Sequence, residues 1–175
     1  MDETTDDVRE ELEETFADRK EYIAVAESAT GGLVGSLVTD VPGASDFFDR
    51  SVVTYTYDAK LQELCVSREA LDENGAVSAR VARQMARGVR DKAGTTWGVS
   101  TTGIAGPTGG TDEKPVGTVY VGVAYAGEWG TQSSYAKAER HTFETDGNDA
   151  ERRRHLKRRF AETALRELTE EARSV

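Results

Sequence analysis

The chain has 175 residues, enough for one domain with its own core, and 32 acidic against 22 basic residues give it a net charge of −10. This acid excess argues against nucleic acid or an anionic membrane as the main partner. No apolar run reaches the roughly 20 residues that span a bilayer, the acidic N-terminus is no signal peptide, and the single cysteine, Cys65, excludes an internal disulfide. We therefore expect a soluble, cytoplasmic protein.

The basic residues carry a second signal. Only six of the 22 are lysine, so sixteen are arginine. An acid excess with few lysines keeps a surface hydrated in concentrated salt, where screening removes most of the self-repulsion. We therefore hypothesise a halophilic host. The alternative is an acidic mesophilic protein, and a free energy of unfolding that rises steeply from low to molar salt would separate the two.

Taken in chain order, the hydrophobic pattern predicts strands and helices that mostly alternate. The acidic segment 1–19 is expected to form a helix that packs on the domain, because Val8, Leu12 and Phe16 recur at four-residue spacing. The further elements expected are strands at 22–27, 51–57 and 95–102, helices at 30–39, about 58–65, 67–73, 78–93 and 149–172, and a hairpin of 116–125 with about 131–143. The serines at 67 and 78 are expected as N-caps. The sequence thus predicts one α/β domain over 1–175, a layered sandwich with a mixed β-sheet flanked by helices.

Three stretches at expected strand ends carry unusual residues, and ligands of open α/β sheets bind where such ends converge. The first is Glu-Ser-Ala-Thr-Gly-Gly at 27–32. The N-terminus of the following helix would offer N–H groups to an oxyanion or a phosphate, and glycines let a ligand approach the backbone. Two interpretations are open for Ser28. It is either an N-cap, the commoner role of serine at such a position, or a nucleophile.

The second stretch, 55–60, follows the next expected strand and contains Tyr55 and Lys60. A serine nucleophile needs a group that accepts its proton, and both histidines, His141 and His155, lie far away in the C-terminal third. A lysine whose pKa is lowered by burial can do this work, as in Ser-Lys enzymes. The alternative for Lys60 is a surface lysine, although the start of a helix is where the helix dipole disfavours one.

The third stretch runs from Thr102 through a loop at 103–115, with four glycines in eight residues. That density is far above background and too elaborate for a plain turn. A disordered linker is the alternative, but strands are expected close on both sides. The pattern favours a loop that cradles a ligand.

Together, "AESATGG", "VVTYTYDAK", "GAVSARVARQMARG" and "TTGIAGPTGGTDEKPVGTVYVGVA" closely resemble the CinA C-terminal domain family, that of nicotinamide-nucleotide amidohydrolase (PncC). The resemblance runs from about residue 20 to the end. It implies an α/β domain, often a homodimer, that hydrolyses the carboxamide of nicotinamide mononucleotide to nicotinic acid mononucleotide and ammonia in NAD recycling. The N-terminal molybdopterin-binding-like domain of full-length CinA is absent from this sequence.

The sequence departs from the family pattern in three places. Ala29 stands where the family usually has cysteine, so that thiol is dispensable or the activity is altered. The usual "YSNEAK" is "YTYDAK" here, which keeps Tyr55 and Lys60. The C-terminal "GDR" of the family is replaced by "GNDAERRRHLKRR". Arg153 is the best match for its arginine, with Arg152 and Arg154 as alternatives.

The resemblance implies the following roles. Ser28 would attack the carboxamide carbon, Lys60 would move its proton to the leaving ammonia, and Tyr55 would hydrogen-bond within the pair and help to keep the lysine pKa low. Backbone N–H groups around 30–32 would stabilise the oxyanion, and Arg153 would pair with the phosphate. The expected catalytic residues are Ser28, Lys60, Tyr55 and Thr102, and the expected substrate-binding residues are Thr30, Gly31, Gly32, Gly103, Ile104, Gly106, Gly109, Gly110, Lys114 and Arg153.

The expected partner is thus a small-molecule substrate. No cofactor is expected, the reaction requires no metal, and we expect no cluster that could hold one. Two other functions remain open, a non-catalytic nucleotide-binding regulatory module of the competence/damage-inducible type and the hydrolysis of a different amide. A pure binder would need no nucleophile and base, so the presence of both Ser28 and Lys60 argues against the regulatory module.

Overall fold

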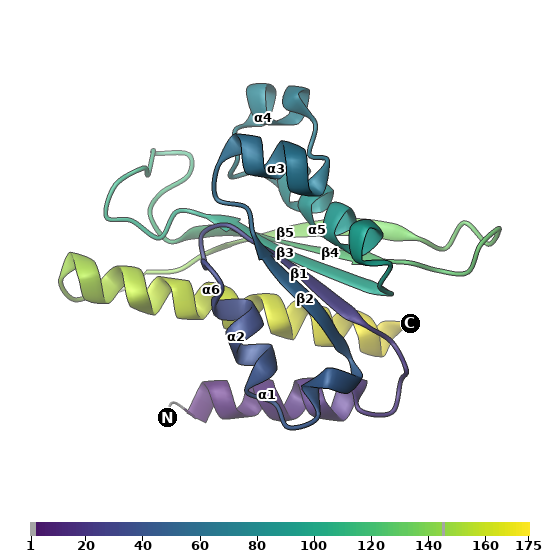
Figure 1. The fold of residues 1–175 in the computed structure, drawn as a ribbon. Helices are drawn as coiled ribbons and strands as arrows, with labels where there is room; N and C mark the ends of the chain where they lie inside the picture. Colours follow the sequence, from purple (N-terminus) through teal and green to yellow (C-terminus); the bar gives the residue numbers. More distant parts are fainter. Residues whose placement is uncertain (1–2, 145) are drawn as a thin grey trace.

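The computed structural model of the protein describes residues 3–144 and 146–175 (Figure 1). One mixed sheet has the strand order β2-β1-β3-β4-β5. Its strands are β1 (Ile23–Glu27), β2 (Phe48–Val53), β3 (Trp97–Gly103), β4 (Thr118–Tyr125) and β5 (Tyr135–Thr142). β1 runs parallel to both β2 and β3, whereas β4 and β5 form an antiparallel hairpin beside β3. The predicted fold class, a mixed sheet flanked by helices in a single domain, is confirmed.

Helices cover both faces of this sheet (Figure 1). One face carries α1 (Glu3–Phe16), α2 (Leu33–Thr39) and α6 (Asp149–Ser174), and the other carries α3 (Tyr57–Leu64), α4 (Arg68–Asn74) and α5 (Ala79–Ala93). Residues of β1 alternate between the two cores, with Ile23 and Val25 on the first side and Ala24 and Ala26 on the second. All five residues of β1 are buried, which agrees with the predicted strand covered on both faces.

The N-terminal helix α1 belongs to the first core. Val8, Leu12 and Phe16 are at most 1% exposed and join the apolar stripe of α6, which includes Leu156 and Phe160. The four-residue spacing read from the sequence therefore marks the buried face of α1. Burying such a stripe supplies most of the stability of a short helix.

Several element boundaries differ from those expected. The strand expected at 51–57 ends at Val53, and Tyr57 opens α3 because the Thr56 hydroxyl accepts a hydrogen bond from the Ala59 N–H, as an N-cap does. The helix expected from residue 30 begins at Leu33, after two glycines with φ of +62° and +99°. The first helix ends at Phe16 and the last strand covers only 135–142. The N-caps predicted at Ser67 and Ser78 are confirmed.

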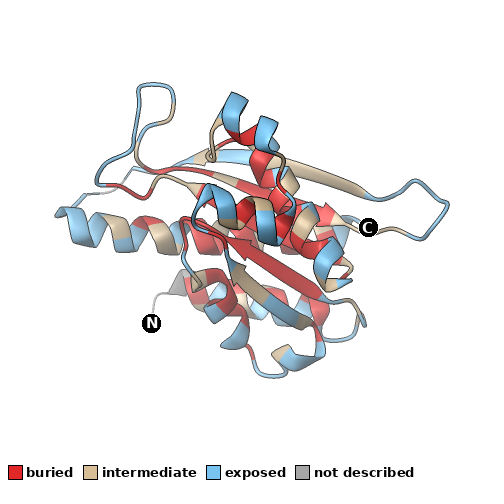
Figure 2. Cartoon of the chain, turned by 45° about the horizontal axis from the view of Figure 1, so that its top comes forward, coloured by how far each residue is buried: buried red, intermediate tan, exposed pale blue. Residues whose placement is uncertain are grey.

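The hairpin of β4 and β5 extends beyond the helical layers, and Figure 2 shows its tip as exposed (128–134) while the central strands are buried. Trp129 lies in this tip and is fully exposed, whereas Trp97, the first residue of β3, is fully buried and packs against the Tyr125 ring at a tilt of 40°. Arg90 of α5 donates hydrogen bonds to the carbonyls of Tyr125 and Tyr135, which fastens the base of the hairpin. None of the described helices is long and apolar enough to cross a membrane.

Candidate active site

A cavity of about 200 Å³ opens where the turn after β1 faces the loop after β3. Strands β1 and β3 are parallel neighbours, so their carboxyl ends meet at the same edge of the sheet, where ligands of such sheets bind. The cavity is lined by Ser28, Ala29, Tyr55, Gly103, Ile104, Ala105, Gly106, Thr108, Gly109 and Arg153. Residues from all three stretches singled out in the sequence therefore meet in one place.

Ser28, which lines this cavity, is in direct contact with Lys60 behind it. The Lys60 Nζ lies 3.0 Å from the Ser28 Oγ, and it donates to the backbone carbonyls of Thr54 at 2.7 Å and Tyr55 at 3.1 Å. Lys60 is fully buried although it lies in the first turn of α3, and Ser28 is 9% exposed. A hydroxyl that reaches the cavity and an amine behind it form the arrangement of a nucleophile and its base.

Burial lowers the pKa of Lys60 to about 8. A neutral amine has two N–H groups and one lone pair. The carbonyls of Thr54 and Tyr55 can take the two N–H groups, which leaves the lone pair to accept a hydrogen bond from the Ser28 hydroxyl. The geometry thus suits the neutral lysine as a proton acceptor near neutral pH.

The N-cap interpretation of Ser28 is wrong. The N-cap residue of α2 is Gly32, which has no side chain to cap the helix. The backbone N–H of Ser28 donates to the Thr101 carbonyl of β3, at 3.0 Å, and its hydroxyl meets Lys60. The serine is therefore fixed at the end of β1, one turn before the helix begins, and its hydroxyl serves no helix end.

The carboxylate of Glu27 takes the place of the cap. This side chain is fully buried and accepts five hydrogen bonds, from the N–H groups of Gly32, Val34 and Gly35 and from the hydroxyls of Thr30 and Ser51, at 2.7 to 3.1 Å. A carboxylate at a helix N-terminus is favoured by both the free N–H groups and the helix dipole. Glu27 therefore ties the start of α2 to β2 and holds the turn that carries Ser28.

Gly35 allows α2 to approach that closely. A Cβ at Gly35 would lie 2.6 Å from the Ser51 Cβ and 3.5 Å from a Glu27 carboxylate oxygen. A larger residue would push α2 away from β2 and disturb the hydrogen bonds of Glu27. Nothing in the sequence analysis singled out Gly35 or Ser51. A glycine in the first turn of a short helix is the one available signal, because it marks a close packing contact.

Tyr55 is placed differently from its expected role. Its backbone carbonyl accepts from Lys60, but its side chain is 62% exposed at the mouth of the cavity. Within the described residues, no hydrogen bond joins the phenol to the Ser28–Lys60 pair. The expectation that the phenol hydrogen-bonds within the pair is wrong, and the low pKa of Lys60 has burial as its cause.

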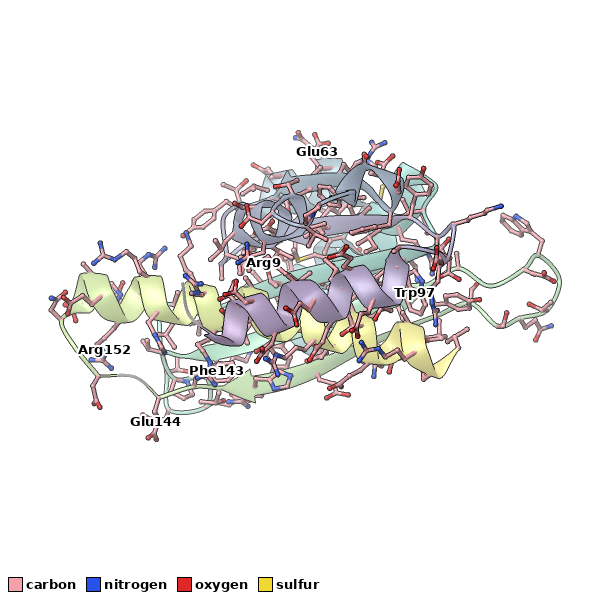
Figure 3. All side chains as sticks on the ribbon, turned by 90° about the horizontal axis from the view of Figure 1, so that it is seen from below. Arg9, Glu63, Trp97, Phe143, Glu144 and Arg152 are labelled. Atoms are coloured by element: carbon pink, nitrogen blue, oxygen red, sulfur yellow. The ribbon has the colours of Figure 1, made fainter. Side chains whose placement is uncertain are left out.

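The three arginines that open α6 point to three different places. Arg153 lines the cavity and donates a hydrogen bond to the Gly106 carbonyl of the glycine-rich loop. Arg152 lies at the N-terminal end of α6 together with Phe143 and Glu144, as Figure 3 shows. Arg154 lies beside Leu33 of α2. Of the three candidates, only Arg153 faces the cavity.

Lys157 is a further basic residue that the sequence analysis did not select. Its ammonium approaches the turn after Ser28, 3.4 Å from where a Cβ of Gly31 would lie. It comes one helical turn after Arg153, so the same face of α6 presents two cations to this end of the sheet. Helical spacing could have revealed this pair, but only once the start of α6 was known.

Other predicted residues lie outside the cavity lining. Thr102 is 1% exposed and its hydroxyl donates to the Ala76 carbonyl, and Thr30 is fully buried between Glu27 and Thr101. The Gly32 N–H is taken by Glu27, so it is no free donor for an oxyanion. Lys114 donates to the Asn74 carbonyl, away from Ser28. The predicted residues that do not line the cavity are Lys60, Thr102, Thr30, Gly31, Gly32, Gly110 and Lys114.

The glycine-rich loop forms the opposite wall, over 103–109. Gly106 has a φ of +73°, and a Cβ there would lie 2.6 Å from Val116, so only glycine fits. The base of the loop is closed by hydrogen bonds between Ile104 and both Thr118 and Gly117. Ala29, Ala105 and Thr108 also line the cavity, although none was selected from the sequence.

Comparison with known proteins places this geometry in a family. The family model of the CinA C-terminal domain matches residues 5–172. A CinA-like protein of Chlorobium limicola is 48% identical over 161 residues, which are 89% of this chain and 35% of that protein. A CinA-like protein of Salinibacter ruber is 53% identical over 149 residues, which are 85% of this chain and 33% of that protein. The chain thus spans about a third of the length of these two relatives.

Solved structures show the same fold over more than nine-tenths of their length. The competence/damage inducible protein CihA of Agrobacterium tumefaciens superposes with a TM-score of 0.80 at 34% identity, covering 91% of this chain and 92% of that chain. A CinA superfamily protein of Klebsiella pneumoniae gives a TM-score of 0.85 at 26% identity, covering 98% and 99%. The resemblance read from the sequence motifs is therefore confirmed at the level of the family, and the chain belongs to the CinA C-terminal domain family.

Proposed function

We propose that the chain is an amidohydrolase that deamidates nicotinamide mononucleotide to nicotinic acid mononucleotide and ammonia through a Ser-Lys pair. The observation that carries the proposal is the 3.0 Å contact between the buried Lys60 amine and the Ser28 hydroxyl at the wall of the cavity. A module that only bound a nucleotide would need neither the nucleophile nor a buried amine behind it.

In the first step, the Ser28 Oγ attacks the carboxamide carbon and the neutral Lys60 accepts the hydroxyl proton. The tetrahedral intermediate collapses as Lys60 returns this proton to the leaving nitrogen, which releases ammonia and leaves an acyl ester on Ser28. Water, deprotonated by Lys60, then hydrolyses the ester to the carboxylate and restores the serine.

The backbone N–H groups of residues 29–31 are our proposal for the oxyanion site, because Ala29 lines the cavity and the Gly32 N–H is already taken. A donor in such a site is worth roughly 3 to 4 kcal/mol of transition-state stabilisation. Arg153, which lines the same cavity, supplies the charge that would pair with the phosphate of the mononucleotide. The exposed ring of Tyr55 offers an aromatic surface at the mouth for the substrate ring.

The test is ammonia release from nicotinamide mononucleotide by the wild type and by Ser28→Ala. The wild type should turn over, and Ser28→Ala should lose three or more orders of magnitude in kcat, as removal of a serine nucleophile does in comparable enzymes. Because Ser28 caps no helix, the Tm of the Ser28→Ala variant should barely differ from that of the wild type. Wild-type turnover in Ser28→Ala would refute the mechanism. If the wild type binds the mononucleotide without releasing ammonia, the result supports the regulatory module. If it releases ammonia only from other carboxamides, the chain is an amidohydrolase with a different substrate.

A further inference from the structure

A second group of ionisable side chains lies on the other half of α6, beside the edge strand β5. Glu139 and His141 are alternate residues of β5, and Glu167 comes from α6. One ligand atom from each, a histidine nitrogen and two carboxylate oxygens, lie within 4.8 Å of one another. Tyr135 and Lys137, on the same alternate positions of β5, also reach α6, at Glu171. This face of β5 is therefore directed at α6.

The carboxylate of Glu167 is the unusual member of the group. It is 92% buried, at 8% exposure, and its Oε1 contacts the His141 Nε2. Its Oε2 is buried and has no hydrogen-bond partner among the described residues. Burial raises the pKa of this group to about 7, although His141 acts in the opposite direction. An unpartnered oxygen on a buried carboxylate is costly, and a bound cation would satisfy it.

The surrounding charges define what could bind. Lys137 lies close to Glu171 and 3.5 Å from Glu139. Because Glu171 can pair with Lys137, the carboxylate of Glu139 stays available to a metal ion. Two carboxylates and one imidazole remain. Oxygen and imidazole nitrogen ligands together favour a borderline transition metal over Mg²⁺ or Ca²⁺, which take oxygen ligands.

We propose that Glu139, His141 and Glu167 form a Zn²⁺ site that joins β5 to α6. Zinc ligands lie at about 2.0 to 2.2 Å from the ion, so neighbouring ligand atoms stand roughly 3.3 Å apart. Glu139 is exposed and can rotate inward, whereas Glu167 and His141 are already held together. Water would complete the tetrahedron.

This site is independent of the proposed amidohydrolase reaction. Glu167 follows Arg153 by about four turns of α6, so the group lies far from the cavity. A metal there would cross-link an edge strand, which has neighbours on one side only, to the longest helix. The sequence predicted no cluster that could hold a metal, because the two strand residues and the helix residue are 26 or more positions apart.

The experiment uses the full chain freed of metal with a chelator. Addition of Zn²⁺ at about one hundred times its Kd should raise the Tm by roughly 5 to 10 °C, and calorimetric titration should give one ion per chain. Mg²⁺ at the same concentration should leave the Tm unchanged. Glu139→Gln, His141→Asn and Glu167→Gln should each weaken Zn²⁺ binding at least tenfold. The matched controls, His155→Asn and Glu170→Gln, change exposed residues of α6 outside the group and should bind as the wild type does.

Glu139 is exposed, so Glu139→Gln keeps the test valid even if a change at Glu167 prevents folding. The proposal is overturned if the wild type shows no Tm shift, if Mg²⁺ gives the same shift as Zn²⁺, or if Glu139→Gln binds as the wild type does. Loss of binding in His155→Asn would place the ion elsewhere and would equally overturn it. Ammonia release plays no part in these measurements.

Discussion

The two halves of α6 lie beside two sites whose buried ionisable groups are of opposite kind. The first half faces the cavity that Arg153 and Ser28 both line, and the buried Lys60 contacts Ser28. The second half faces β5, where the buried Glu167 meets His141. Burial moves both pKa values towards neutrality, lowering that of Lys60 to about 8 and raising that of Glu167 to about 7. Desolvation thus acts alike on an acid and a base, by favouring the uncharged form.

What differs is how the neighbours satisfy each group. Lys60 has three hydrogen-bond partners, and its neutral form can keep all of them. Glu167 has a partner for one oxygen and none for the other among the described residues. Near the cavity, the buried carboxylate of Glu27 has five donors. Burial alone therefore does not distinguish these sites. A buried group whose hydrogen bonds are all made, such as Glu27, has no need of a ligand, whereas Glu167 has an oxygen left to bind one.

The largest expected effect comes from Lys60→Met, which keeps the length of the side chain and removes its amine. If Lys60 is the base, kcat for ammonia release should fall by about a thousandfold or more. Lys92→Met is the matched control, because Lys92 also donates to a backbone carbonyl, that of Gln62, but lies on the surface. Steady-state kinetics on both variants decides the matter. If Lys60→Met keeps most of the wild-type rate near neutral pH, Lys60 is not the base and the Ser-Lys mechanism is wrong.

A pair of substitutions tests the contrast between the two buried carboxylates. Glu27→Gln should lower the free energy of unfolding by about 3 kcal/mol, because an amide nitrogen replaces an acceptor that faces several donors. Glu167→Gln should change it by less than about 1 kcal/mol in metal-free protein, because only one oxygen has a partner. Urea unfolding of both variants gives the comparison. Equal losses would mean that burial alone sets the cost.

Arg153→Ala tests the first half of α6. A phosphate contact is shared by the ground state and the transition state, so this variant should raise KM about tenfold or more with little change in kcat. Arg154→Ala is the matched control, because that arginine lies beside Leu33 and outside the cavity. Nicotinamide riboside, which lacks the phosphate, should be a poor substrate of the wild type. Equal kcat/KM values for riboside and mononucleotide would exclude a phosphate anchor.

The pH dependence should follow Lys60. With a pKa near 8, about a tenth of the lysine is neutral at pH 7 and about nine-tenths at pH 9, so kcat/KM should rise roughly tenfold between them. The unfolded chain binds more protons between pH 8 and 10.5, so the free energy of unfolding should also rise with pH across that window. Lys60→Met should flatten the stability curve there. An activity profile that is level from pH 7 to 9 would contradict the neutral-lysine base.

The sequence predicted the fold because its elements carry local signals. Val8, Leu12 and Phe16 mark a buried helix face, and Ser67 and Ser78 mark helix starts. The sequence placed Ser28 and Lys60 at expected strand ends, which the parallel pairing of β1 with β2 and β3 brings together.

Other contacts depend on register across distant segments, which no local pattern encodes. The role of Glu27 requires Ser51 and α2 to meet at its side chain, and the environment of Thr102 requires Ala76. The meeting of His141 with Glu167 depends in the same way on how α6 lies against β5. The direction of a side chain could not be predicted from the sequence either. The backbone carbonyl of Tyr55 points towards Lys60, whereas its phenol is exposed.

The two tryptophans give the protein two separate optical reporters. Trp97 is fully buried at the start of β3 and its indole N–H donates to Glu21, whereas Trp129 is fully exposed at the hairpin tip. A soluble quencher such as iodide should therefore reach Trp129 and leave the emission of Trp97 untouched until the sheet unfolds. Trp129→Phe would leave a single blue-shifted signal from the buried Trp97. With that variant, unfolding of the core could be followed by fluorescence without an added dye.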